Sequence, residues 1–209
     1  MKPLHRWIAV SASAMALSGC VPAGMLLGAG AVAVHTASQE RAPLDTVRDA
    51  DILLTLNSRY LEHSAELFSN VAISVVEGRV VLTGSVPERI DRVAATEIAW
   101  ATSGVTSVTD EMTVRAGGDA IDYAEDALIS NQLRLALVAD TSISSVNYSV
   151  ETVDKIVHIT GLARNPDELG RVIEQATVIP GVVTVVSHVL TVDDPRRTAM
   201  LTGTGQGAG

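Results

Sequence analysis

Cys20 is the only cysteine in this 209-residue chain, and its thiol is the side chain best suited to covalent chemistry. It closes the tetrapeptide Leu-Ser-Gly-Cys at 17–20, directly behind a long apolar run. Lys2 and Arg6 precede that run. A charged start, an apolar middle and small residues before a cleavage point are typical of a secretory signal peptide. We therefore expect a signal peptide at residues 1–19.

The same tetrapeptide resembles the bacterial lipobox, at which a cysteine thiol is diacylated and a lipoprotein signal peptidase cleaves in front of it. The resemblance implies that the mature chain starts at Cys20, is exported and is anchored by lipid. Val21 follows the cysteine in place of the Asp that the resemblance associates with inner-membrane retention. We therefore expect a lipid anchor in the outer membrane, with the protein facing the periplasm.

One alternative is an uncleaved signal anchor, a single membrane helix across residues 7–34, because a membrane span needs about 20 apolar residues. Pro22 and several glycines interrupt this stretch and argue against a continuous helix. Both readings export everything downstream, because positively charged flanks stay in the cytoplasm.

The expected mature chain contains four histidines, which are the other candidates for metal or acid–base chemistry: His35, His63, His158 and His188. His158 and His188 fall on two β-rich runs and are candidates to be neighbours on one face of a sheet. Two histidines are the start of a zinc site, but such a site takes three or four protein ligands. The sequence offers no third ligand at metal spacing, so we expect no metal and no cofactor.

Catalysis needs a nucleophile, a base and an orienting group held together. No serine in the repeated part of the chain has a partnered base, and the glycine-rich stretches match no phosphate-binding loop. Carboxylates such as Asp122, Glu125 and Asp126 lie near a helix start, where acidic residues suit the helix dipole. We therefore expect no catalytic residues and interpret the protein as non-enzymatic, with an envelope hydrolase as the weakest function considered.

Charge limits the possible partners. The chain carries 15 Lys and Arg against 24 Asp and Glu, a formal net charge of −9. Loss of Lys2 and Arg6 with the signal peptide removes two positive charges and takes −9 to −11. A protein this acidic is not expected to bind nucleic acid, which needs clustered basic residues. With Cys20 acylated, no disulfide forms within the chain, so stability must come from burial of a largely aliphatic core.

An internal repeat organises the rest of the chain. Three motifs recur with one shift of 77 residues: 49–56 returns at 126–133, 82–84 at 159–161, and 104–105 at 181–182. The first motif is Asp-x-x-Ile-x-x-x-Leu, the second ends in Thr-Gly, and the third is Gly-Val. Agreement of three landmarks on one shift indicates two copies of one small unit.

Each copy predicts the same order of elements. Apolar residues at i, i+4 and i+8 predict an amphipathic first helix at 46–63 and at 120–138. β-rich runs follow at 71–76 and 79–83, with a tight turn at Glu77-Gly78, and in the second copy at 146–151 and 155–160, with a longer loop at 152–154. Pro87 and Pro166 open a second helix, and last strands follow at 107–114 and 183–192.

This pattern predicts an α+β protein of two tandem α-β-β-α-β domains, at 44–114 and 119–192. Each domain is expected to be a three-stranded mixed sheet with two helices on one face. Residues 20–43 form a Gly/Ala-rich tether, and residues 193–209 are expected to be a disordered tail. Four structural glycines are predicted. Gly104 and Gly181 end the second helices, and Gly84 and Gly161 lie where the second hairpin strand leaves the sheet.

The Asp-x-x-Ile helix, the hairpin ending in Thr-Gly and the Gly-Val before the last strand together resemble the BON domain, named for bacterial osmotically inducible and nodulation proteins. A lipobox, a tether and two such units resemble the dual-BON lipoproteins of Gram-negative outer membranes. The resemblance covers residues 44–192. It implies non-enzymatic modules that maintain envelope integrity by binding phospholipid or envelope-assembly proteins.

The first helix of the second copy carries more apolar residues than its core side needs. Leu128, Leu135 and Val138 form a second apolar stripe, with Tyr123 at its start. A surplus stripe of this kind marks a contact with a membrane or a protein. In the alternative, the first domain covers the stripe, and the protein is a structural, partner-binding lipoprotein of a secretion or efflux assembly, with no lipid contact beyond its anchor.

Overall fold

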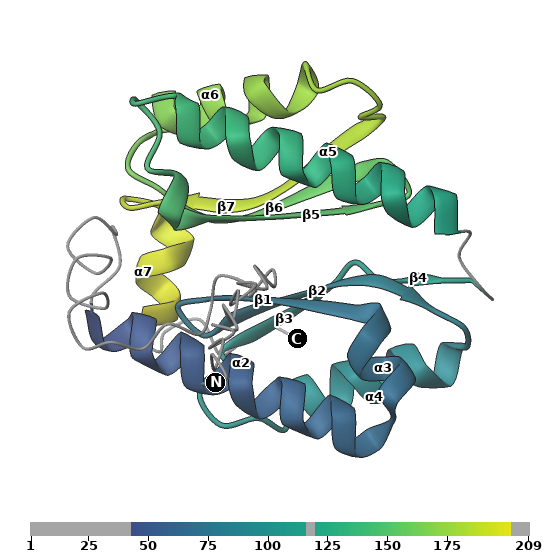
Figure 1. The fold of residues 1–209 in the computed structure, drawn as a ribbon. Helices are drawn as coiled ribbons and strands as arrows, with labels where there is room; N and C mark the ends of the chain where they lie inside the picture. Colours follow the sequence, from purple (N-terminus) through teal and green to yellow (C-terminus); the bar gives the residue numbers. More distant parts are fainter. Residues whose placement is uncertain (1–42, 116–119, 202–209) are drawn as a thin grey trace, which may run out of the picture.

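The computed structural model describes residues 43–115 and 120–201. Cys20, the expected signal peptide and all but the last residue of the expected tether lie outside the described residues, as do 116–119 and 202–209. Figure 1 shows four layers: helices, a sheet, a second sheet and helices again. The two sheets lie next to each other in the middle, and the helices cover the two outer faces.

The first unit contains three helices and four strands. They are α2 (Pro43–His63), α3 (Ala65–Asn70), β1 (Val71–Val76), β2 (Arg79–Val86), α4 (Arg89–Trp100), β3 (Ser107–Asp110) and β4 (Thr113–Val114). β1 is antiparallel to β2, and β3 and β4 pair in parallel with β2, so the last strand is broken between Asp110 and Thr113. The short helix α3 was not predicted; the side chain of Ser64 caps it by accepting a hydrogen bond from the N–H of Leu67.

The second unit repeats this plan. It contains α5 (Ala120–Ala139), the 3-10 turn η1 (Ser145–Asn147), β5 (Tyr148–Val153), β6 (Ile156–Ala163), α6 (Pro166–Thr177) and β7 (Thr184–Thr191). Its sheet has the order β5-β6-β7, with β5 antiparallel and β7 parallel to β6. The predicted fold class, two α-β-β-α-β units with three-stranded mixed sheets, is confirmed.

The hairpin of the second unit is tighter than predicted. β5 runs to Val153, and the turn consists of Asp154 and Lys155, with φ of 53° and 64°. Glu77 and Gly78 take the same left-handed conformation in the first unit, with φ of 54° and 74°. Two positive φ values characterise the type I′ turn that joins twisted strands. The longer loop expected at 152–154 is wrong, because the second turn reaches this conformation without a glycine to signal it.

The central strand of each sheet is buried on both faces. Val80 and Leu82 of β2 point into the aliphatic core under α2 and α4, so Arg79, Val81 and Thr83 must point to the opposite face. All three are buried, with exposed fractions of 8%, 2% and 3%. In the second unit Val157 and Ile159 point into the core, and the alternate residues of β6 are buried in the same way: His158, Thr160 and Leu162. The sheet faces that would be open in a single unit therefore pack against each other.

Polar contacts join the two units across this interface. The guanidinium of Arg79 donates to the carbonyl oxygen of His188 at 3.3 Å and to that of Gly161 at 3.4 Å. Arg115 forms an ion pair with Asp154 at 2.6 Å. Burial lowers the pKa of Arg79, although Glu77 and two nearby aspartates act in the opposite direction. The two units therefore form one body with a partly polar seam.

Gly84 and Gly161 were expected where the second hairpin strand leaves the sheet. They lie within the strands instead, because β2 continues to Val86 and β6 to Ala163. A Cβ on Gly84 would meet the carbonyl oxygen of Asn70 at 2.0 Å. A Cβ on Gly161 would meet the carbonyl oxygen of Asn147 at 2.4 Å. The repeated glycine is therefore required by close approach of the neighbouring backbone. Gly104 and Gly181 follow α4 and α6, and both have positive φ.

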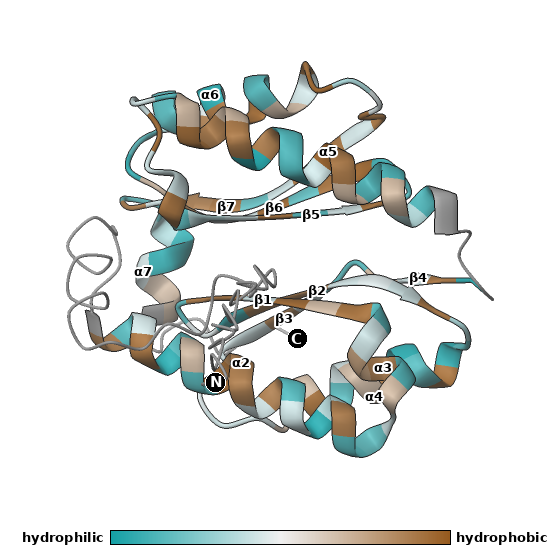
Figure 2. Ribbon diagram, viewed as in Figure 1, coloured by the Kyte–Doolittle hydropathy of each residue, from teal (hydrophilic) through white to brown (hydrophobic). Residues whose placement is uncertain are grey.

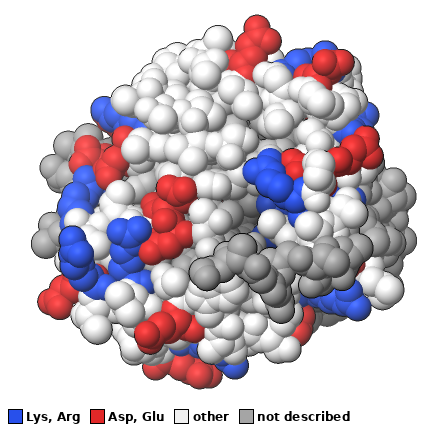
Figure 3. Space-filling model, turned by 180° about the vertical axis from the view of Figure 1, so that it is seen from behind, with Lys and Arg blue, Asp and Glu red and all other residues white. Residues whose placement is uncertain are grey.

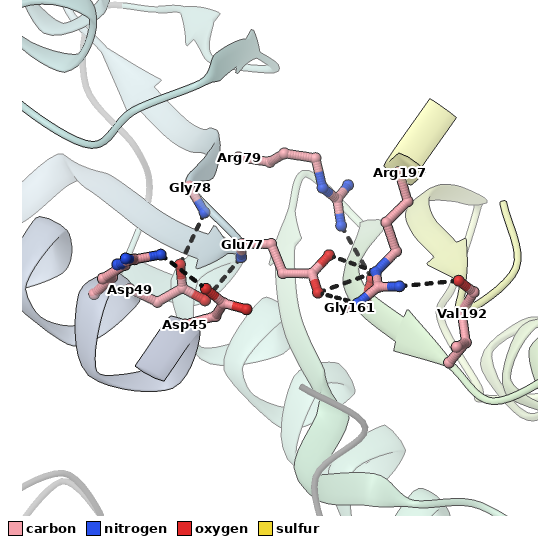
Figure 4. Close-up of polar contacts among 9 residues, drawn as sticks. Asp45, Asp49, Glu77, Gly78, Arg79, Gly161, Val192 and Arg197 are labelled. Atoms are coloured by element: carbon pink, nitrogen blue, oxygen red, sulfur yellow. Dashed lines mark hydrogen bonds and ion pairs between the residues drawn. The ribbon is translucent and has the colours of Figure 1, made fainter. Parts of the chain in front are cut away.

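The structure also differs from the expected disordered tail. Residues Pro195–Leu201 form a short helix, α7. The guanidinium of Arg197 donates to both carboxylate oxygens of Glu77 at 2.7–3.0 Å and to the carbonyl oxygen of Val192 at 3.0 Å (Figure 4). Only 2% of the Glu77 side chain is exposed. The Arg197–Glu77 pair orders the start of the tail, which composition alone did not predict.

Candidate functional site

The predicted contact helix is α5, whose core side is well defined. Ile129, Leu133 and Leu137 are almost fully buried against the second sheet. Alanine and leucine are strong helix formers and fill much of this helix. Within residues 43–115 and 120–201, no helix combines the length and the apolar character that crossing a bilayer requires.

The predicted apolar stripe lies on the exposed side of α5. The exposed fractions are 57% for Leu128, 70% for Leu135 and 66% for Val138. With 3.6 residues per turn, Leu128 and Leu135 lie within about 20° of each other around the helix, and Val138 lies about 60° from Leu135. Figure 2 shows α5 on the outer layer, with apolar segments along its length. In the described part of the chain, the first unit therefore does not cover these three residues, which we call the α5 stripe.

Tyr123 belongs to a different surface. Around the helix it lies about 140° from Leu128, and it lines a cleft of about 380 Å³ between the two units. Arg134 of α5 and Arg115 of the first unit line the same cleft. Tyr123 is 56% exposed. The structure therefore brings Leu128, Leu135 and Val138 together and separates Tyr123 from them.

Several of the charges near the α5 stripe are already paired. Glu125 forms an ion pair with Lys155 at 2.8 Å. Arg134 contacts Glu151 at 3.3 Å and also donates to the carbonyl oxygen of Val150. Burial raises the pKa of Glu151, and Arg134 opposes that shift.

On the face of the molecule shown in Figure 3, acidic and basic side chains are interspersed and form no broad basic patch.

The structure places His158 and His188 side by side on β6 and β7, as the sequence suggested. Their ring centroids are 6.3 Å apart and their planes are parallel within 1°. The first sheet covers most of both side chains: His158 is 6% exposed, and the side chain of His188 is 17% exposed. Burial lowers the pKa of both imidazoles, and the Glu111 carboxylate acts in the opposite direction.

Glu111 is a residue that the sequence analysis missed. It follows β3 in the first unit, where its N–H donates to the carbonyl oxygen of Leu82 at 2.9 Å. Its Oε1 lies 3.3 Å from Nε2 of His188. No spacing along the chain signals this approach, because it depends on how the two units pack.

Comparison with known protein families decides what these units are. The model of the BON domain matches residues 48–116 and 125–193. This chain belongs to the BON family. Each α-β-β-α-β unit is one BON domain, and the α5 stripe lies on the first helix of the second BON domain.

Three relatives place this dual-BON chain among known proteins. It is 37% identical to an uncharacterised protein of Anaplasma centrale over 144 residues, covering 68% of this chain and 94% of that protein. It is 26% identical to osmotically-inducible protein Y of Escherichia coli, covering 68% and 72% of the two chains. It is 24% identical to the outer membrane lipoprotein DolP of Haemophilus influenzae, covering 77% and 83%.

The first BON domain also carries an exposed apolar stripe that the sequence analysis missed. Val47, Leu54 and Leu61 of α2 are 62%, 62% and 54% exposed. They recur at seven-residue spacing and lie within about 40° of each other around the helix. The signal in the sequence is the same as for Leu128 and Leu135: apolar residues recur every seven positions outside the core side of the helix. Applied to α2, this signal identifies Val47, Leu54 and Leu61.

Proposed function

We propose that this BON protein is a lipid-anchored protein of the cell envelope. It is held in the outer membrane through Cys20 and faces the periplasm. It supports envelope integrity by binding, not by catalysis, and its contact surface for phospholipid or for an envelope-assembly protein is the α5 stripe.

The sequence and the relatives support the envelope part of this proposal. The lipobox-like tetrapeptide ends at Cys20, and a lipid-modified terminus with more than one chain gives firm anchoring. One relative is named an outer membrane lipoprotein, and another is named an osmotically inducible protein. The aligned region includes more than two thirds of each of these two relatives, so the similarity extends over both BON domains.

The exposure of the α5 stripe is the observation that carries the binding part, and the equally exposed residues Leu54 and Leu61 of α2 provide the control that decides between the two helices. Full burial of a Leu or Val side chain contributes about 1.5–3 kcal/mol. Contact with an interface realises only part of this free energy, so an isolated domain binds weakly. The lipid on Cys20 holds the domain near the bilayer and raises its effective concentration there, so a weak site can be occupied.

Charge favours some occupants of the stripe over others. The expected mature chain has a net charge of −11, and Asp122 and Glu125 lie on the same helix. Like charges repel, so anionic headgroups are poor ligands, although the ion pair with Lys155 neutralises Glu125. We therefore favour a zwitterionic headgroup region or a protein partner over an anionic lipid surface.

The second candidate function, a structural lipoprotein of a secretion or efflux assembly, rested on burial of this stripe against the first domain. Exposed fractions of 57–70% for Leu128, Leu135 and Val138 remove that support.

An NMR titration tests the proposal. The chain from residue 20 onward carries Cys20→Ser, so that no lipid anchor contributes to binding. Zwitterionic and anionic micelles are added separately. We expect chemical-shift changes that cluster around Leu128, Leu135 and Val138 and that are larger with zwitterionic than with anionic micelles. The double substitution Leu128→Asp with Leu135→Asp should abolish these changes.

A matched control is available on the first domain. Leu54→Asp with Leu61→Asp places the same two charges on an equally exposed helix and should leave the titration unchanged. Shifts that centre on α2, or that survive the α5 double substitution, contradict the assignment. No binding to either micelle, combined with capture of an envelope protein that the α5 substitutions abolish, identifies the protein partner.

A further inference from the structure

Three side chains from both BON domains converge at the seam between the two sheets. Glu111 directly follows β3 in the first domain, and His158 and His188 come from β6 and β7 in the second. Each offers one ligand atom, and these three atoms all lie within 4.8 Å of one another. On the parallel strands β6 and β7 the two rings are diagonal neighbours, because His188 pairs with Thr160, two residues after His158.

Two nitrogen atoms in this cluster lack hydrogen-bond partners. They are Nδ1 of His158 and Nε2 of His188, and both are buried. Nε2 of His188 lies 3.3 Å from Oε1 of Glu111, which is close enough for an ion pair but is not aligned as a hydrogen bond. Buried polar atoms are nearly always paired in folded proteins, so each exception needs an explanation.

The donor set has a definite metal preference. Two imidazole nitrogens and one carboxylate oxygen suit borderline transition metals, of which Zn²⁺ is the most common in proteins. Ca²⁺ and Mg²⁺ prefer all-oxygen sites and fit this set poorly. Ligands at about 2.0–2.1 Å from tetrahedral zinc stand about 3.3 Å from each other. A small inward movement of the three side chains therefore reaches coordination distance.

We propose that Glu111, His158 and His188 bind one zinc-type divalent metal ion that clamps the two BON domains together. The ion takes the two unpaired imidazole nitrogens and the carboxylate as ligands, and its fourth position is left for water. The site is independent of the α5 stripe, which lies on the outer surface. Its role is structural, because the ligands come from two domains that otherwise meet through a partly polar seam.

A positively charged side chain lies close to the three proposed ligands. Arg79 donates to the carbonyl oxygen of His188, so its positive charge opposes a cation at this site. Its charge is offset by acidic neighbours, which include Glu77, Asp49 and Asp194. The competing explanation is a simple ion pair between Glu111 and a protonated His188, with His158 as a buried neighbour.

Metal titration of the mature-length chain separates these two explanations. The chain from residue 20 onward carries Cys20→Ser, because a free thiol would itself bind zinc. After removal of metal by a chelator, Zn²⁺ is titrated by calorimetry, and Co²⁺ is titrated with its visible absorption bands as the readout of coordination. We expect one ion per chain and a higher thermal midpoint in the presence of Zn²⁺.

Substitutions assign the ligands. His158→Gln, His188→Gln and Glu111→Gln should each weaken Zn²⁺ binding by about 100-fold or more, since even substitutions beyond the ligands cost about 10–100-fold. His63→Gln, on the exposed end of α2, should bind as the unsubstituted chain does. If a histidine variant fails to fold, Glu111→Gln still tests the site, because Glu111 is only half-buried and its substitution should leave the fold intact.

Two results overturn the proposal. One is the absence of stoichiometric Zn²⁺ or Co²⁺ binding by the folded chain, which leaves the ion pair only. The other is Zn²⁺ binding with unchanged affinity in Glu111→Gln, which places the ion elsewhere. Neither result bears on the α5 stripe, whose titration with micelles is done without metal.

Discussion

Asp49 and Asp126 stand 77 residues apart and make the same contact in the two BON domains. The carboxylate of Asp49 accepts hydrogen bonds from the N–H groups of Glu77 and Gly78, both at 2.8 Å (Figure 4). The carboxylate of Asp126 accepts them from Asp154 and Lys155 at 2.8 and 2.9 Å. The first helix is thereby tied to the hairpin turn, which explains why an Asp leads each repeat.

Substitution of Asp126 tests this contact. Hydrogen bonds to a charged group contribute about 1.5–3 kcal/mol each, so the loss of both in Asp126→Ala should lower the free energy of unfolding by about 3–6 kcal/mol. Asp126→Asn keeps one acceptor oxygen and should lose about half as much. Urea unfolding and amide exchange at Asp154 and Lys155 measure the two effects. An Asn variant as stable as the unsubstituted chain would show that the carboxylate is not needed.

Glu168 is predicted to set part of the acid sensitivity of the second domain. It is wholly buried and accepts hydrogen bonds from the N–H of Ser144 at 2.7 Å and from the backbone and side chain of Arg164 at 3.0 and 2.8 Å. Burial by itself would raise the pKa of Glu168, but the side-chain hydrogen bond from Arg164 and the two backbone hydrogen bonds outweigh it, so the pKa is lowered.

The sign of the effect follows from linkage. The pKa of Glu168 is lower in the folded than in the unfolded chain, so its stabilisation is fully present above the unfolded pKa of about 4.3. It is lost as the pH falls through the folded pKa. Glu168→Gln weakens the hydrogen bonds to a charged group and should lower the free energy of unfolding by about 1.5–3 kcal/mol at pH 7. The gap between variant and unsubstituted chain should close below pH 4 in acid-unfolding curves; a constant gap would contradict the assignment.

The repeat was readable from the sequence because its landmarks carry local physics. Asp49 and Asp126 bind turns within their own domains, and Gly84 and Gly161 permit close backbone approach. Features that depend on how the two domains pack against each other could not be predicted from the sequence. Glu111 is one, because its position beside His188 arises only when two sheet faces pack, and no residue spacing encodes that.

Two smaller misses have different causes, one local and one long-range. Asp154 and Lys155 form a left-handed turn without glycine, so the usual signal was absent. Helix α7 is only seven residues long and depends on the pair between Arg197 and Glu77, which lie far apart in the chain. The α5 stripe, in contrast, was found because surplus apolar residues show directly in the helical pattern.

Cys20→Ala tests the lipid anchor. Without the thiol, no acyl chain attaches and the signal peptidase for lipoproteins does not cleave. We expect a longer, unprocessed protein that leaves the outer-membrane fraction. A chain with Leu128→Asp and Leu135→Asp, which keeps Cys20, should still be processed and should fractionate with the outer membrane. Normal processing and fractionation of Cys20→Ala would mean that the lipobox interpretation is wrong.

Photo-crosslinking in the native envelope tests the central claim, that the α5 stripe is the contact surface of the anchored protein. A photoreactive residue replaces Leu135 in the full chain with Cys20 intact, and a matched one replaces Leu54 on α2. We predict that the Leu135 position crosslinks to phospholipid or to one envelope protein, that Asp at Leu128 abolishes the product, and that the Leu54 position gives much less of it. Crosslinking from Leu54 alone, or no product from Leu135, would contradict the claim.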